Sequence, residues 1–86
     1  MYEVRLSARA RRFYADAHRP LALKLAHCFR QLEEDPRRHP NIKPLKGKLA
    51  GSYRYRVGDH RVIYTIDEGG RIVVVAIIAH RREVYE

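Results

Sequence analysis

The sequence of 86 residues has no tryptophan, one methionine and one cysteine. A single cysteine excludes an internal disulfide and fits a reducing compartment. The longest apolar run, residues 72–79, is far shorter than the roughly 20 residues that span a bilayer. The first residues also lack the apolar stretch of a signal peptide. We therefore expect a cytoplasmic protein without membrane association.

Motifs for cofactors and metal ions are missing as well. The five histidines and Cys28 show no ligand spacing, and no glycine-rich loop is present to hold a phosphate. The chain is too short for a dinucleotide-binding fold or a barrel. We expect neither a metal nor a cofactor. Cys28 falls on the apolar stripe of a predicted helix, so we interpret it as a buried hydrophobic residue.

Positive charge is concentrated in the middle of the sequence. The chain has 18 Lys and Arg against 10 Asp and Glu, a formal net charge of +8. Residues 36–66 contain eight of the basic residues and one acid, Asp59, so this segment alone carries +7. Such a field favours a polyanion, an acidic protein or an anionic surface as partner. The alternative is a solvated surface that serves solubility.

Apolar spacing near the N-terminus predicts one strand and two helices. Residues 2–6 alternate in polarity, as in a half-buried strand. Ser7 is a suitable N-cap, and the apolar residues of 10–17 recur with helical spacing. Pro20 suits the first turn of a second helix, which residues 33–36 end. The two helices are predicted to form a helical hairpin.

An extended connector and three strands are predicted in the rest of the chain. The connector is residues 37–50, which contain two prolines. Turn residues bound the three strands, predicted at 52–57, 60–67 and 71–79. The last strand is apolar on both faces, so we expect it inside the sheet. The 86 residues thus predict one α+β domain of order β-α-α-β-β-β, with an antiparallel-rich sheet and the helical hairpin on one face.

Strand alternation places three arginines together. Arg54 and Arg56 share one face of their strand, and Arg61 lies on a face of the next strand. A sheet with helices on one face leaves the other face to water or a ligand. We predict that the three arginines converge there, because guanidinium groups match phosphate geometry. The alternative is a set of edge-strand charges that block aggregation.

Four short motifs lie in the second half of the chain. They are LKG at residues 45–47, YRYRV at 53–57, RVIY at 61–64 and HRREVY at 80–85. Together they resemble the RelE/ParE toxin superfamily, and most closely its RelE branch. The resemblance covers almost the whole chain, including the predicted order of elements. The combination is specific, although no single motif is.

What the resemblance implies is the toxin of a toxin–antitoxin system, a ribosome-dependent endoribonuclease that works without metal. RelE-like toxins cut mRNA in the ribosomal A site, where the messenger's own 2′-hydroxyl attacks the neighbouring phosphate. The products are a 2′,3′-cyclic phosphate and a free 5′-hydroxyl. This chemistry needs a group to accept the 2′ proton, positive charge for the phosphorane, and an acid for the 5′ oxygen.

The same resemblance assigns site residues. The family's paired basic positions fall on Arg54 and Arg56, and its transition-state arginine falls on Arg61. The arginine and tyrosine after the last strand fall on Arg81 and Tyr85, and the tyrosine orients the base or assists proton transfer. The further residues that we predict to bind RNA are Lys43, Lys46, Lys48 and Arg82.

One departure from the family pattern concerns the general base. RelE has lysines that can help to accept the proton where this chain has Arg54 and Arg56. Arginine does not deprotonate in proteins, so these two stabilise charge but cannot accept a proton. Tyr85 and His80 are therefore the candidates, and an imidazole titrates near neutral pH. The alternative is that His80 only ends its strand.

Two other functions are compatible with this scaffold. A ParE-like toxin inhibits DNA gyrase by binding and lacks the ribonuclease residues that are present here. A non-catalytic RNA-binding module would use basic charge together with tyrosines as stacking platforms.

The resemblance also implies partners. A cognate antitoxin, which we expect to be acidic because of the chain's charge, wraps the toxin with extended and helical segments. The ribosome and mRNA are the other partners. The toxin–antitoxin complex can form higher oligomers.

Overall fold

A computed structural model describes residues 1–83 of the chain. Tyr85, one of the predicted site residues, lies outside the described residues. The elements within them are β1 (Glu3–Leu6), α1 (Ala8–Asp16), α2 (Arg19–Glu34), β2 (Ile42–Pro44), the 3-10 turn η1 (Gly47–Leu49), β3 (Tyr53–Val57), β4 (His60–Asp67), β5 (Ile72–His80) and the 3-10 turn η2 (Arg81–Glu83). Neither helix of this part of the chain is long and apolar enough to cross a membrane.

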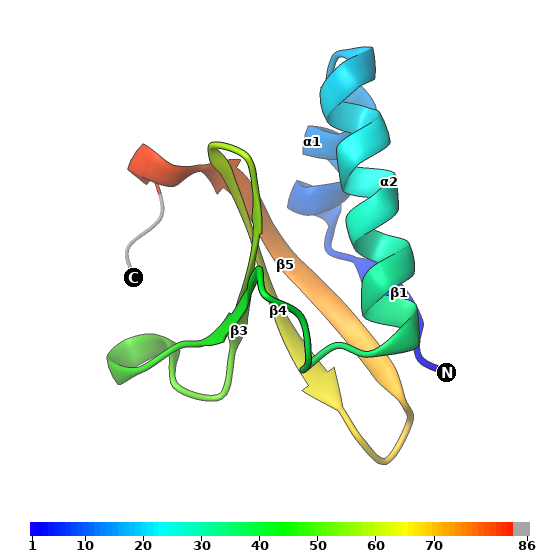
Figure 1. Ribbon diagram of the computed structural model, residues 1–86, viewed down its shortest axis with the longest axis vertical. Coiled ribbons are helices and arrows are strands. Elements are labelled where there is room, and N and C mark those ends of the chain that lie inside the picture. The colour runs from blue at the N-terminus through cyan, green and yellow to red at the C-terminus, as the bar shows by residue number, and fades with distance from the viewer. Residues whose placement is uncertain (84–86) are drawn as a thin grey trace.

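The strands form one mixed sheet in the order β1-β5-β4-β3-β2. β1 pairs in parallel with β5, and the other neighbours are antiparallel. In Figure 1, α1 and α2 lie together on one side of the sheet, whereas η1 and η2 lie on the other side. The predicted α+β fold with a helical hairpin on one face is confirmed. β5 lies between β1 and β4, as its apolar sequence predicted.

The connector differs from the prediction of a purely extended segment. β2 forms within it and pairs with β3 through Ile42↔Tyr55 and Lys43↔Arg54, and η1 follows. β2 is an edge strand, where Pro44 is tolerated because its missing N–H need not join the ladder. Three residues carry too short an alternation to predict a strand, so tertiary pairing with β3 determines this element.

Both helices begin at side-chain caps. Ser7 Oγ accepts a hydrogen bond from the Ala10 N–H at 3.0 Å, so the predicted cap of α1 is confirmed. Pro20 lies in the first turn of α2, also as predicted. The cap of α2 itself is His18, whose Nδ1 accepts from the Leu21 N–H at 3.3 Å. Histidine is not among the preferred capping residues, so the sequence did not predict this role.

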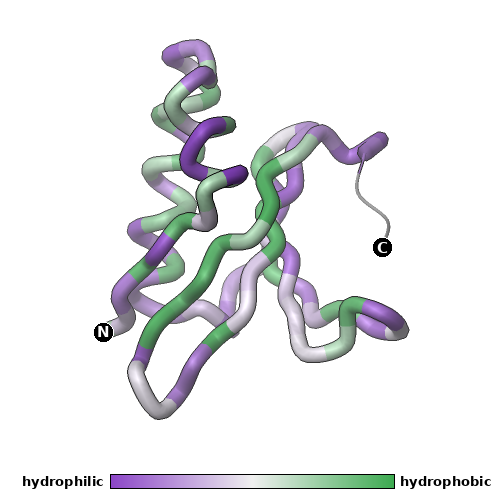
Figure 2. Tube along the Cα trace, turned by 180° about the vertical axis from the view of Figure 1, so that it is seen from behind, coloured by the Kyte–Doolittle hydropathy of each residue, from purple (hydrophilic) through white to green (hydrophobic). Residues whose placement is uncertain are grey.

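The core lies between the helices and the sheet. Leu25, Cys28 and Leu32 of α2 are fully buried and belong to one cluster with Tyr55 and Tyr64 of the sheet. Figure 2 shows the hydrophobic stretch that β5 adds to this layer. Burial raises the pKa of the Cys28 thiol to about 12, which keeps it neutral and unreactive. The interpretation of Cys28 as a buried hydrophobic residue is confirmed.

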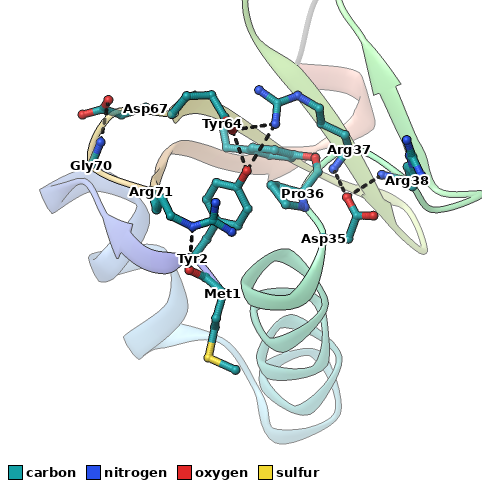
Figure 3. A network of polar contacts seen from close by, with 11 residues as sticks. Met1, Tyr2, Asp35, Pro36, Arg37, Arg38, Tyr64, Asp67, Gly70 and Arg71 are labelled. Carbon is teal, nitrogen blue, oxygen red and sulfur yellow. Dashed lines mark hydrogen bonds and ion pairs between the residues drawn. The ribbon is translucent and has the colours of Figure 1, made fainter.

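A polar network joins the N-terminus, the connector and the β4–β5 turn (Figure 3). The buried Tyr64 hydroxyl donates to the Pro36 carbonyl at 2.7 Å. Beside it, Arg37 donates to the Glu68 carboxylate at 2.7 Å, and the Tyr2 hydroxyl donates to the same carboxylate. The bonds from Tyr2 and then Arg37 lower the pKa of Glu68.

Candidate functional site

The register of β2, β3 and β4 brings four basic residues onto one face of the sheet. Arg56 and Arg61 are directly opposite partners on β3 and β4. Arg54 lies two residues before Arg56, and its partner on β2 is Lys43. Opposite residues share a face, and the alternate residue Tyr55 is in the core, so these four lie on the side away from the helices. We call Lys43, Arg54, Arg56 and Arg61 the basic face.

The positive charge of the basic face is suited to binding an anion. Arg61 Nη1 donates to the carbonyls of Gly58 at 3.4 Å and His60 at 3.2 Å, which holds this guanidinium near the β3–β4 turn. Arg56, opposite it, is exposed. Like charges that are directly opposite on paired strands repel each other. A phosphate bound between them would relieve this repulsion and accept the hydrogen bonds of both.

η2 brings Arg81 to the same turn. The Arg81 N–H donates to the Asp59 carbonyl at 2.7 Å, and Arg81 Nη1 lies 3.7 Å from Asp59 Oδ1. Arg82 is exposed in η2. Arg81 is therefore positioned at the end of the basic face where Arg61 contacts the turn. Asp59, the one acidic residue of the basic segment 36–66, is what positions it.

Lys46 and Lys48 occupy a different loop. Lys46 precedes η1 and Lys48 lies within it, and both are exposed. Figure 1 shows η1 on the same side of the sheet as η2, at a distance from the β3–β4 turn. The two lysines thus extend the positive surface around the basic face rather than join its four residues.

A β-bulge in β5 reverses the face of the sheet on which its last side chains lie. Tyr64 pairs with Val75, but the preceding residue of β4 pairs with Ile77, so Ala76 has no directly opposite partner. The alternation is inverted beyond this point, because Val75 before the bulge and Ile78 after it both belong to the core. His80 comes two residues after Ile78 and therefore points to the helix side.

Ser7 holds the bulge in place. Its hydroxyl donates to the Ala76 carbonyl at 2.7 Å while its oxygen accepts from the Ala10 N–H. One side chain thus caps α1 and satisfies the carbonyl of the extra residue in β5.

His80 is placed with His60 rather than with the basic face. The centroids of the two rings are 5.5 Å apart in an edge-to-face arrangement. The His60 ring also contacts the ring of Phe13 in α1, with 5.7 Å between the centroids. His80 Nδ1 accepts the Arg82 N–H at 3.2 Å, which leaves the proton of a neutral ring on Nε2. Burial and the nearby His80 lower the pKa of His60. The sequence did not single out this pair, although hairpin register places the two residues opposite each other.

Comparison with known proteins gives a family for this chain. Residues 4–85 match the model of a family described as the ParE toxin of type II toxin–antitoxin systems, parDE. The toxin RelG of Mycobacterium tuberculosis is 36% identical over 88 residues, a match that covers 98% of this chain and 95% of that protein.

Solved structures have the same fold. The toxin–antitoxin complex RelBE2 of Mycobacterium tuberculosis contains a chain with a TM-score of 0.80 and 30% identity, covering 93% of this chain and 98% of that one. The archaeal RelE–RelB complex of Pyrococcus horikoshii gives a TM-score of 0.81 at 20% identity, covering 96% and 98%. At 20% identity, this second match shows a shared fold only.

Proposed function

Because the chain belongs to the RelE/ParE superfamily of toxins of type II toxin–antitoxin systems, we propose that it cuts mRNA in the ribosomal A site and so inhibits translation. Its partners are then a cognate antitoxin, the ribosome and mRNA, and it acts in the cytoplasm. The observation that carries the proposal is the pair Arg56 and Arg61, directly opposite on adjacent strands with Arg54 on the same face.

The proposed reaction transfers a phosphate within the RNA chain. The 2′ oxygen forms a bond to phosphorus, and the bond from phosphorus to the 5′ oxygen breaks. The 2′ proton passes to a base, and an acid gives a proton to the 5′ oxygen. The step therefore needs no metal and consumes no water. Arg54, Arg56 and Arg61 stabilise the additional negative charge of the phosphorane, which develops only in the transition state. Arg81 binds an adjoining phosphate at the β3–β4 turn.

Proton transfer is assigned to His80 and Tyr85. The guanidinium groups of the basic face cannot accept the 2′ proton. His80 lies at the last position of β5, where RNA bound across the β3–β4 turn would have to reach around the strand end to its Nε2. Replacing His80 with Gln tests this role, since a His80 that transfers a proton makes the cleavage rate depend on pH, and the variant loses this dependence. A profile that is flat in both proteins would assign the step to Tyr85.

Primer extension on a defined mRNA, held in ribosomes with an empty A site, tests the proposed function. We expect a new stop inside the A-site codon with ribosomes and none with free mRNA. Arg61→Ala and Arg81→Ala should slow this cleavage by about a hundredfold to a thousandfold, as loss of a transition-state donor does. Arg30→Ala, an exposed arginine of α2 on the helix side, is the matched control and should cleave normally.

Gyrase inhibition is the second candidate, because the family model that matches is that of the ParE toxin. A DNA supercoiling assay with the same preparation separates the two. Inhibition of gyrase without cleavage of ribosome-bound mRNA would replace the ribonuclease proposal. RNA binding without either activity would leave the non-catalytic RNA-binding module.

A further inference from the structure

Arg56 lies where β2 stops covering the outer edge of β3. Ile42 of β2 pairs with Tyr55, and beyond this pair no strand within residues 1–83 lies on the outer side of β3. The backbone of the connector continues the contact by one bond, in which the Arg56 N–H donates to the Asn41 carbonyl at 3.0 Å. On its other side, Arg56 lies opposite Arg61 and repels it. The Asn41 carbonyl therefore holds Arg56 from the side away from the repelling charge.

His39 holds Asn41 in this position. His39 Nδ1 accepts the Asn41 N–H at 3.1 Å, and the His39 carbonyl accepts the Ile42 N–H at 2.9 Å, which closes a turn over residues 39–42. The imidazole stacks on the ring of Tyr55, with 5.1 Å between the centroids and 25° between the planes. Tyr55 is 3% exposed and belongs to the core. The turn that carries the Asn41 carbonyl is thus fixed to the core through the His39 ring.

Histidine combines the two properties that this place uses. A neutral imidazole has an acceptor nitrogen in the plane of a flat ring. Asparagine has an acceptor at a similar distance from the backbone but no ring to stack, and phenylalanine has the ring but no acceptor. The alternative is that His39 only closes the connector turn, in which case its loss lowers stability without a specific effect on Arg56.

We propose that His39 is a positioning residue for the reaction and that it acts through Asn41 on Arg56. The effect on cleavage rests on the proposed function, whereas the effect on the Arg56 backbone does not. Without this support, repulsion from Arg61 moves the edge of β3 away from β4. With it, both guanidinium groups reach the same phosphate before the reaction begins, which is the preorganisation that a site for a charged transition state needs.

Two variants at position 39 separate the hydrogen bond from the stacking. His39→Phe keeps a flat ring against Tyr55 and removes the acceptor, whereas His39→Asn keeps an acceptor for the Asn41 N–H and removes the ring. We expect cleavage of ribosome-bound mRNA to fall by about tenfold in His39→Phe, because Arg56 is displaced. Cleavage by His39→Asn should stay within about twofold of the wild type, although its midpoint of thermal unfolding is lower.

A double-mutant cycle identifies the residue through which His39 acts. In the Arg56→Gln background, His39→Phe should cause no further loss of cleavage, since the guanidinium that it positions is already missing. In the Arg81→Ala background, it should cause the same loss of about tenfold as in the wild type. Single-turnover rates measured below the unfolding midpoint of every variant give the four comparisons.

His18 provides a matched control. Its Nδ1 also accepts a backbone N–H, that of Leu21 at the start of α2. His18→Phe should lower thermal stability and leave the cleavage rate unaltered. Amide hydrogen exchange of the ¹⁵N-labelled chain, measured without ribosomes, reports on the backbone directly. The Arg56 amide should exchange about tenfold faster in His39→Phe and at the wild-type rate in His18→Phe.

Four results would overturn the proposal. Equal loss of cleavage in His39→Phe and His18→Phe would mean an effect on stability alone. Equal loss in His39→Phe and His39→Asn would exclude the bond to Asn41 as its cause. A further loss of about tenfold in the Arg56→Gln background would mean that His39 acts elsewhere. Unaltered exchange of the Arg56 amide in His39→Phe would exclude the support itself, whereas a wild type that leaves ribosome-bound mRNA intact would refute only the proposed function.

Discussion

Arg56 and Arg61 repel each other in the unbound protein. They are directly opposite on β3 and β4, where side chains of one sign raise the free energy of the folded state. Arg61 gains hydrogen bonds to two backbone carbonyls at the turn, while Arg56 is exposed. Side chains held against their mutual repulsion are expected where a ligand of opposite charge completes the arrangement.

Replacing Arg56 with Gln should therefore separate stability from activity. The variant loses one guanidinium of the phosphorane site, so cleavage of ribosome-bound mRNA should fall by about a hundredfold or more. The repulsion with Arg61 disappears, so the midpoint of thermal unfolding should stay the same or rise slightly. Calorimetry together with the cleavage assay measures both. A variant that loses activity because it unfolds at a lower temperature would contradict this assignment.

His60 predicts a pH dependence of stability. Burial beside Phe13 and His80 lowers its pKa in the folded chain, whereas an unfolded histidine has a pKa of about 6.5. Below that pH the unfolded chain binds more protons than the folded one, so the free energy of unfolding decreases as the pH falls. Urea unfolding at a series of pH values from neutral to mildly acidic measures this. His60→Gln should have a flatter profile, and an unchanged slope would exclude His60 as its source.

At the scale of elements, the bulge of β5 decides what its C-terminal end can do. Without the bulge, if the alternation continued unbroken from Val75 through Ala76, His80 would point to the same side as Arg61. With it, His80 packs against His60, and Arg81 and Arg82 follow in η2. Bulges are frequent next to functional sites because they redirect side chains in this way.

Ser7 variants can separate the cap of α1 from the bulge. Aspartate at position 7 still accepts the Ala10 N–H but has no proton to donate to the Ala76 carbonyl. We expect Ser7→Asp to lower the free energy of unfolding by about 1 kcal/mol and to shift the ring resonances of His80. Ser7→Ala removes both bonds and should lower it by about 2 kcal/mol. If Ser7→Asp were as stable as the wild type, the bond to Ala76 would contribute nothing, and if the two variants were equally stable, the cap bond from Ala10 would contribute nothing.

Local pattern predicts most of these elements, but long-range pairing does not follow from it. The turn at residues 58–59 joins β3 to β4 directly, so alternation was sufficient to bring the arginines together. The apolar residues 72–79 carry no signal for a bulge, because either facing of the strand buries similar side chains. For the same reason the position of His80 beside His60 required the structure.

Charge is polarised over the whole molecule. Five of the ten acidic residues belong to two segments, 33–35 and 67–68. The polar network of Figure 3 joins these two segments near one end of the molecule. The basic face and η2 meet at the β3–β4 turn, which Figure 1 shows at the opposite end of the sheet. A molecule with this distribution is oriented by the field of a polyanion before contact, with the basic face leading.

This polarity predicts a salt dependence that differs from residue to residue. Binding to single-stranded RNA releases counterions, so the logarithm of the affinity falls linearly with the logarithm of the salt concentration, by about 0.7 per phosphate contact. Arg54→Gln and Arg61→Gln should each reduce this slope by about that amount. Arg30→Gln removes the same charge from α2 on the helix side and should leave the slope unchanged. Fluorescence anisotropy with a labelled oligonucleotide over a salt series measures the three slopes. If the Arg30 variant changed the slope as much as the other two, the phosphates would follow the net charge of the chain, and the convergence of arginines on the basic face would have no part in binding RNA.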